Sequence, residues 1–224
     1  MGYFTSDYLA FFKELDKNNQ KIWFDQNRNR YENAVKIPFR QLVEEMIVRI
    51  QSDNADVLIS PAEAIFRINR DIRFSKDKTP YKTHMAAMIS AGGKRARYLP
   101  GFYFQIGING IRVYSGVHDL DKAKLEAIRK MIAENHKIFG KIISEKNFIE
   151  HFPEIHGEKQ KRIPPEFQEA YKQQPLIANK DFYVLCDLDS KLIIHENLSD
   201  KLMDIYFVAK PFLTFLGKAV LKRT

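Results

Sequence analysis

Two apolar alternations that meet at an Asn-Gly pair restrict the fold of this chain more than any other part of its sequence. Their apolar residues are Phe102, Phe104, Ile106 and Ile108 before the pair, and Ile111, Val113 and Val117 after it. A period of two is typical of a strand with one buried face. Asn109-Gly110 supplies the positive φ angles of a tight hairpin turn. We therefore expect an antiparallel hairpin in which Ile108 faces Ile111.

The second face of this hairpin has a different character. Its side chains are Tyr103, Gln105, Arg112 and Tyr114. A face of this composition is either exposed to solvent or forms the floor of a site, and both interpretations stay open here. Further period-two runs predict strands at residues 65–74, 84–91, 182–187 and 192–194.

Helical spacing of apolar residues dominates the N-terminal part of the chain. Three helices are expected within residues 1–55: one after a Thr5/Ser6 cap, one after Asn18-Asn19, and one that begins near Pro38. Each has an apolar stripe at a period of three to four residues, so each is expected to bury one face.

Helices are also expected after the hairpin. Asp119 or Asp121 precedes a helical pattern, and a shorter helix covers residues 138–143. Residues 150–166 are rich in His, Pro and charge and are predicted to form a loop. Ser199 is expected to cap a long final helix, which Pro211 kinks.

Helices on both sides of a run of adjacent strands indicate an α+β fold with a mainly antiparallel sheet. A helical N-terminal block and a long C-terminal helix flank that sheet. We find no clean linker and no internal repeat. Residues 1–224 are therefore expected to form a single domain, with a helical block at 1–55 and a sheet-containing core at 56–224.

The positive charge of the chain is concentrated in one segment. Residues 67–97 hold nine Lys and Arg against two acids, which gives +7 of the net charge of +8. The densest part, residues 66–84, interleaves Arg with Ile and Phe, and this pattern ties the charges to a core. In the run 65–74 a straight strand would place Arg70 on the apolar face. We therefore expect either a break near Asn69 or a buried Arg70 beside Asp71 or Asp77.

The run RDIRFSKDKTPYKTH, with Trp23-Phe24 upstream and a hairpin then a helix downstream, resembles a bacterial and fungal family known as domain of unknown function 2461. The resemblance covers nearly the whole chain and is specific at ten positions: Arg67, Arg70, Asp71, Arg73, Phe74, Asp77, Lys78, Pro80, Tyr81 and Lys82. Asn19, Trp23, Phe24 and Tyr31 fit the family's helical pattern more loosely. The family also implies a Pro-Gly-Phe/Tyr segment, which we expect Pro164-Pro165-Glu166-Phe167 to replace. The resemblance implies a single cytoplasmic domain and no particular activity.

The basic segment is the candidate anion-binding site. Its proposed ligating cations are Arg67, Arg70, Arg73, Lys76, Lys78 and Lys82. Arg grips phosphate or carboxylate through paired hydrogen bonds, and Lys adds a point charge. Asp71 and Asp77 cannot neutralise six cations, which favours a bound anion over a purely structural network of salt bridges.

Candidate groups for proton transfer surround the turn at Pro80. Asp77, Tyr81 and His84 are the three we select. Against this interpretation, Tyr81 also suits an aromatic core position, and His84 suits the first residue of a strand.

Other classes of site find little support in the sequence. No metal site is predicted, because the six histidines show no ligand spacing beyond His151 and His156 in a loop. No Walker-type or dinucleotide-binding fingerprint occurs, and the sequence leaves the cofactor unknown. No apolar run approaches the roughly 20 residues needed to span a bilayer. The single cysteine, Cys186, excludes a disulfide framework and favours the cytoplasm.

Three functions remain open at this stage. The first is binding of a phosphorylated small molecule or nucleotide by the 67–82 cluster, with or without catalysis. The second is a nucleic-acid-binding module that uses the 67–97 basic surface. The third is a non-enzymatic scaffold whose cluster is a structural salt-bridge network.

Overall fold

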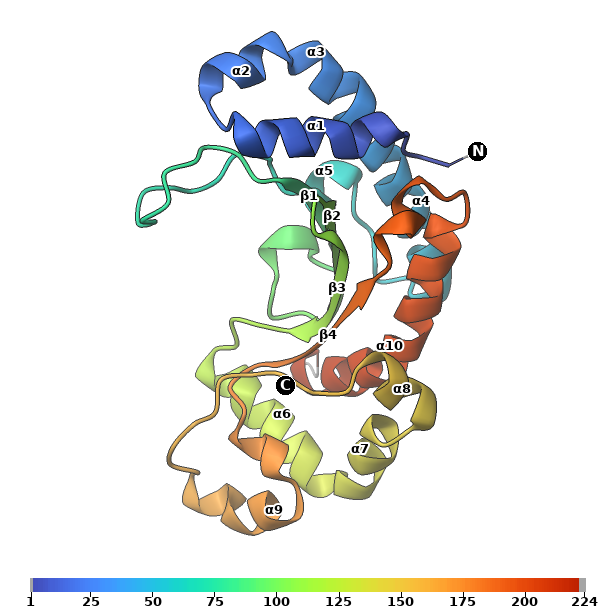
Figure 1. The fold of residues 1–224 in the computed structure, drawn as a ribbon. Helices are drawn as coiled ribbons and strands as arrows, with labels where there is room; N and C mark the ends of the chain where they lie inside the picture. Colours follow the sequence, from blue (N-terminus) through green and yellow to red (C-terminus); the bar gives the residue numbers. More distant parts are fainter. Residues whose placement is uncertain (1, 222–224) are drawn as a thin grey trace.

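A four-stranded antiparallel sheet lies at the centre of the molecule, which a computed structural model describes for residues 2–221 (Figure 1). The strands are β1 (His84–Ser90), β2 (Gly101–Gly107), β3 (Gly110–Val117) and β4 (Phe182–Leu188), and they lie side by side in chain order. The predicted strands at 84–91 and 182–187 and the predicted hairpin are confirmed. The α+β class with an antiparallel sheet is confirmed as well.

The register of the hairpin differs from the prediction. Ile106 pairs with Ile111 and Gly107 with Gly110, so Ile108 and Asn109 form the connection. Of the turn residues only Gly110 has a positive φ, at 91°. One glycine at positive φ after the turn is what a type I turn followed by a β-bulge requires. The pairing moves by an even number of residues, so the predicted apolar face is correct although the predicted partners are wrong.

Five helical segments form the first part of the described chain. They are α1 (Ser6–Lys17), α2 (Lys21–Gln26), α3 (Arg28–Arg30), the π-helical turn η1 (Tyr31–Lys36) and α4 (Ile37–Asp53). Thr5 is the N-cap of α1 and Pro38 lies in the first turn of α4, as predicted. A short helix, α5 (Pro61–Ala64), follows. The η1 turn was not predicted, because a π-helical bulge leaves almost no mark on apolar periodicity.

The remaining helices lie before and after β4 in the sequence, and short 3-10 turns lie between several of the elements. The helices are α6 (Lys122–Glu134), α7 (His136–Ile143), α8 (Lys146–His151), α9 (Gln168–Gln173) and α10 (Leu198–Val220), and the turns are η2 (Gly93–Arg95), η3 (Pro165–Phe167), η4 (Pro175–Ala178) and η5 (Ser190–Ile194). Asp121 caps α6 and accepts a hydrogen bond from the Lys124 N–H at 2.8 Å. Two predictions fail here, because residues 192–194 are 3-10 helix and Ser199 lies inside α10. The expected 150–166 loop is confirmed for residues 152–164, with helical residues only at its two ends.

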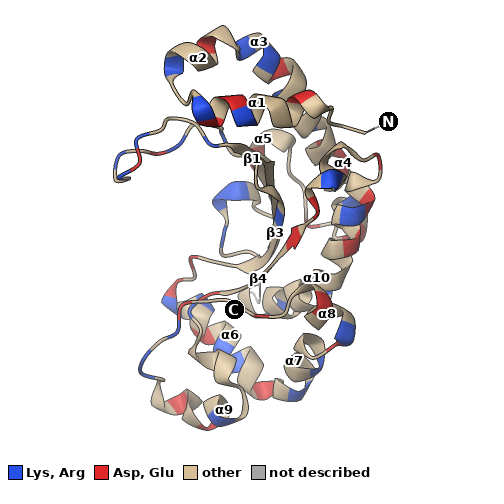
Figure 2. Cartoon of the chain, in the orientation of Figure 1, with Lys and Arg blue, Asp and Glu red and all other residues tan. Residues whose placement is uncertain are grey.

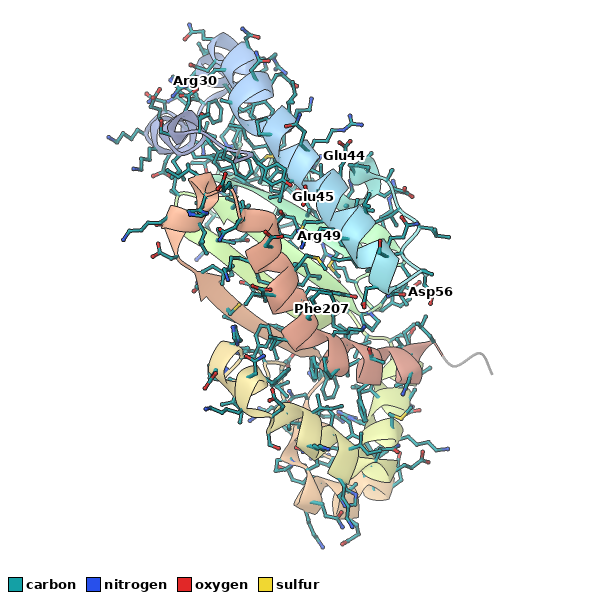
Figure 3. The ribbon with its side chains drawn as sticks, turned by 90° about the vertical axis from the view of Figure 1, so that its right-hand side faces the viewer. Arg30, Glu44, Glu45, Arg49, Asp56 and Phe207 are labelled. Carbon is teal, nitrogen blue, oxygen red and sulfur yellow. The ribbon has the colours of Figure 1, made fainter. Side chains whose placement is uncertain are left out.

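One face of the sheet is covered by α4 and α10 (Figures 1 and 3). The ring centroids of Phe39 (α4) and Phe104 (β2) are 5.8 Å apart, as are those of Phe102 (β2) and Tyr206 (α10). Between the two helices, Arg49 of α4 contacts Asp200 of α10 at 2.8 Å. The alternation of β2 thus points its phenylalanines into this core. Neither of these two helices covers the opposite face of the sheet.

The long helix α10 changes direction along its length (Figure 3). Pro211 lies inside it, as predicted, and has no N–H for the carbonyl of Phe207. The bend lets α10 contact α4 and the sheet with one part, and α6, α7 and α8 with the other. No helix among residues 2–221 is long and apolar enough to cross a membrane.

Candidate ligand-binding cleft

A cleft of about 490 Å³ lies on the face of the sheet opposite α4 and α10. This size is typical of small-molecule sites. Its floor is formed by outward-facing side chains of the sheet, among them Tyr103, Gln105 and Tyr114. From the sequence, this face was either exposed to solvent or the floor of a site. These three side chains form the floor of a cleft. Arg112 lies outside the lining and pairs with Asp187 of β4 at 2.6 Å.

Aromatic side chains cross the floor of the cleft in a row. Phe66 precedes β1, and Tyr103, Tyr114 and Tyr183 come from β2, β3 and β4. The centroid distances along this aromatic row are 5.8 Å, 5.5 Å and 6.2 Å. Tyr103 and Tyr114 stand opposite each other in the β2–β3 register. Burial raises the pKa of Tyr103 to about 12, so its phenol is neutral near physiological pH.

The lining of the cleft contains basic side chains and no carboxylate among the described residues. Lys82 and Arg97 are its cations, and His84 and His118 its imidazoles. The Lys82 ammonium donates to the carbonyl of Arg67 at 3.1 Å and lies 5.6 Å from the centre of the Phe66 ring. Burial, and secondly the Arg67 charge, lower the pKa of Lys82. The Arg97 guanidinium contacts Asp119 at 3.2 Å.

His84 begins β1 and faces the cleft, and it is the one predicted proton-transfer residue that lines it. Burial, with the Lys82 charge as a second cause, lowers the pKa of His84 from 6.5 to about 4. The imidazole is therefore neutral near physiological pH. A neutral imidazole is able to accept a proton or donate a hydrogen bond to a ligand.

The depressed pKa of His84 predicts a pH-dependent stability. Between pH 6.5 and pH 4 the unfolded chain holds a proton at His84 that the folded chain lacks, so the free energy of unfolding falls as the pH falls. We expect His84 to contribute up to about 3 kcal/mol of this loss. Urea unfolding of the wild type and His84→Gln across this range measures it. Parallel curves for the two proteins would contradict the prediction.

A His–Asp pair stands at the rim of the cleft, where β3 ends. Nδ1 of His118 lies 2.8 Å from Oδ1 of Asp181, and the N–H of Asp119 donates to the same oxygen at 3.2 Å. Asp119 has φ 56° and is the only residue other than glycine at positive φ within residues 2–221. Residues held at such angles gather at functional sites. An imidazole oriented by a carboxylate is an arrangement suited to proton transfer.

The predicted strand at 65–74 does not form. Residues 69–81 instead project from the sheet as a basic arm, closed by single bridges at Asn69–Tyr81 and Ile65–Ala87 (Figures 1 and 2). Phe74 is 95% exposed, so the expected tie between these charges and a core is wrong. Repulsion among the cations and hydration of the charged tip favour exposure over burial.

The charges of the basic arm largely satisfy one another. Arg70 binds the Asp77 carboxylate and the Thr79 hydroxyl, so the strand breaks near Asn69 and Asp77 is the partner of Arg70. The remaining contacts join Arg73 to Asp71 at 2.6 Å, and Lys78 to the carbonyl of Ile72 at 2.9 Å. Within residues 2–221 neither Arg67 nor Lys76 forms an ion pair. Of the six predicted cations, only Lys82 lines the cleft.

The three predicted proton-transfer residues are not brought together. Asp77 lies on the arm, where the Thr79 N–H, and then Arg70, lower its pKa to about 2. Tyr81 is 7% exposed and stacks on Phe24, with ring centroids 4.1 Å apart. Tyr81 therefore occupies the aromatic core position considered from the sequence. Only His84 reaches the cleft.

Several cleft residues were not predicted as site residues. Asp181 is 63 positions from His118 in the chain, and no local pattern joins them. A local signal did exist for β2, because Pro100-Gly101-Phe102 provides the Pro-Gly-Phe/Tyr segment that the resemblance implies. The expectation that residues 164–167 replace this segment is wrong. Gly101 and Phe102 instead begin the strand that forms the cleft floor.

Comparison with known protein families finds a match over most of the chain. A family described as "Conserved hypothetical protein (DUF2461)" matches residues 7–215 of the chain. The matched span includes the basic arm, all four strands and the residues that line the cleft. No curated protein and no solved structure shows significant similarity to the chain.

Proposed function

The chain belongs to the DUF2461 family, and we propose that it binds an anionic small molecule, either phosphorylated or a nucleotide, in the cleft on the open face of its sheet. The family description names no activity, so the proposal rests on the cleft itself. The proposed site differs in position from the site expected from the sequence. It is centred on the cleft next to the point where the basic arm leaves the sheet, and not on the arm itself.

One observation carries the proposal: the cleft is lined by two cations and two imidazoles and by no carboxylate of the described residues. Lys82 is partly buried, and its lowered pKa reports that the charge is incompletely solvated. An anion near Lys82 would compensate that loss of solvation. The neutral His84 beside it offers a hydrogen-bond donor without adding further charge.

The remaining cations have secondary roles in this proposal. Arg67 stands beside Lys82 and adds to the positive potential at this end of the cleft. Arg70, Arg73 and Lys78 are engaged within the arm, so we assign them to holding its shape. Lys76 forms no ion pair in the described chain. It attracts anions at long range, an effect that salt screens.

Thermal-shift screening against phosphorylated metabolites and nucleotides, followed by calorimetry of the hits, tests the proposal. We expect Lys82→Met/Arg97→Met to weaken binding at least about tenfold, since hydrogen bonds to charged groups are removed. The matched control is Lys130→Met/Lys146→Met, which removes the same charge from exposed helix positions. Equal binding by wild type and Lys82→Met/Arg97→Met, or no stabilisation by any compound of the library, would overturn the proposal.

A further inference from the structure

The aromatic row extends further than one small ligand needs. Its members come from β2, β3, β4 and the segment before β1, so the row crosses the full width of the sheet. It continues past β4, where His156 stacks on Tyr183 with ring centroids 5.5 Å apart and planes inclined by 23°. The four lining rings are partly exposed and not sealed in a core. A single nucleobase covers one or two such rings, and this row offers several.

Positive charge accompanies the row. Lys82 lies against Phe66 at one end, and Arg97 lines the cleft with the rings. Arg67 follows Phe66 in the chain, and the basic arm, which carries more Lys and Arg than Asp and Glu, projects away from the sheet (Figure 2). Side chains that stack bases beside cations that follow a phosphate backbone are the common features of proteins that bind single-stranded nucleic acid.

We propose that the anionic ligand is a short single-stranded nucleic acid whose bases stack along the aromatic row. This inference rests on the proposed function, because it uses the same cleft and the same cations. The strand enters at the basic arm, places phosphates near Lys82 and Arg97, and stacks successive bases on Tyr103, Tyr114 and Tyr183. Rings on the floor of a cleft contact only bases that are free of a duplex, which selects single strands.

Little base specificity is expected from this arrangement. Every base has a π-face, and stacking does not read the hydrogen-bonding edge. The hydroxyl of Tyr103 is engaged with Oε1 of Gln105 at 3.0 Å, which leaves its ring as the main contact surface. Oligonucleotides of different sequence should therefore bind with similar affinity and with a strong salt dependence.

Fluorescence anisotropy with labelled oligo(dT) and oligo(U) of about two, four and six nucleotides tests the inference, with AMP and ribose 5-phosphate as competitors. We expect affinity to rise at least about tenfold from the shortest to the longest oligonucleotide, as more bases stack. Tyr103→Leu/Tyr114→Leu should weaken binding of the longest one at least about tenfold and leave ribose 5-phosphate binding nearly unchanged. The control is Tyr171→Leu on α9, where the tyrosine is 39% exposed and outside the cleft.

The outcomes separate the two proposals. Equal affinity for AMP and all oligonucleotides, or equal affinity for single strands and duplex, would overturn the inference and leave the anion site in place. If the wild type binds neither ribose 5-phosphate nor AMP nor any of the oligonucleotides, both proposals are overturned. If Tyr103→Leu/Tyr114→Leu does not fold, Tyr183→Leu carries the same expectation. Tyr103→Phe/Tyr114→Phe, which keeps both rings, should bind like the wild type.

Discussion

Replacing Arg129 with methionine is expected to lower the free energy of unfolding by about 3 kcal/mol. Arg129 lies on α6 and is only 2% exposed. Its guanidinium donates to the carbonyls of Ile177 at 2.8 Å and Asn179 at 3.3 Å, and to Oε1 of Gln160 at 2.8 Å. Methionine fills a similar volume but donates nothing. Three acceptors then lose their donor.

Two opposing effects decide the size of this loss. Burial lowers the pKa of Arg129, although arginine stays charged, so removing it relieves the cost of burying a cation. Each hydrogen bond from a charged donor contributes about 1.5–3 kcal/mol. The sum of three such bonds exceeds the relief, and the substitution destabilises.

Urea unfolding measures this effect, and Arg112→Met is the matched control. Arg112 is 45% exposed and contacts Asp187 across the β3–β4 pair. An exposed ion pair contributes at most about 1 kcal/mol. Equal losses for the two variants would show that the buried hydrogen bonds of Arg129 contribute no more than a surface pair.

Substituting Gly116 with alanine is expected to cost at least about 3 kcal/mol of folding stability. Gly116 lies in β3 with φ 145°, a backbone angle that residues with a side chain rarely adopt. A Cβ there would stand 2.1 Å from the carbonyl oxygen of Phe182 and 2.6 Å from Cα of Tyr183. Both contacts are with the β4 backbone, so no side-chain rotation relieves them. The strands must separate or the angle must change.

Gly140→Ala is the control for this substitution. Gly140 lies inside α7, and a Cβ there would meet nothing within 4 Å. Alanine in a helix is favoured over glycine by up to about 1 kcal/mol. Thermal and urea unfolding should therefore give changes of opposite sign for the two variants. A Gly116→Ala protein as stable as the wild type would show that β4 adjusts without cost.

Gly116 affects both the stability of the fold and the geometry of the cleft. It pairs with Tyr183, one of the rings of the aromatic row, and it lines the cleft floor. The absence of a side chain allows β4 to approach β3 closely enough for Tyr183 to continue the row. A variant that folds but separates these strands should lose binding of the longest oligonucleotide more than binding of ribose 5-phosphate.

The alternation in residues 102–117 predicted the faces of the central hairpin correctly. A strand with alternating polarity buries one set of side chains whatever the details of its turn, because a slip of one residue would expose the whole apolar set. The turn itself was placed one residue too late. Asn109-Gly110 has the stronger local preference for a two-residue turn, but Gly110 uses its positive φ at the bulge, so Ile108-Asn109 form the connection.

The strand predicted from the sequence at residues 65–74 does not form, and most of this run lies in the basic arm. The period-two run at 65–74 resembles a strand, and β1 accepts only an isolated bridge at Ile65 before the chain leaves the sheet. Arg70 in place of an apolar residue made a fully paired strand costly, because its charge would have entered the core. Projection of the arm resolves this conflict and leaves Phe74 in solvent.

The sequence by itself determined the α+β class, the apolar and polar faces of the hairpin, most helix positions and the location of the positive charge. Each of these depends on contacts between residues close in the chain, or on a periodicity that any buried surface imposes. Only the tertiary structure decided which cations meet a cleft, which rings form a row, and that His118 meets Asp181. Such juxtapositions arise when strands distant in sequence pair in register, and nothing in the local chain records them.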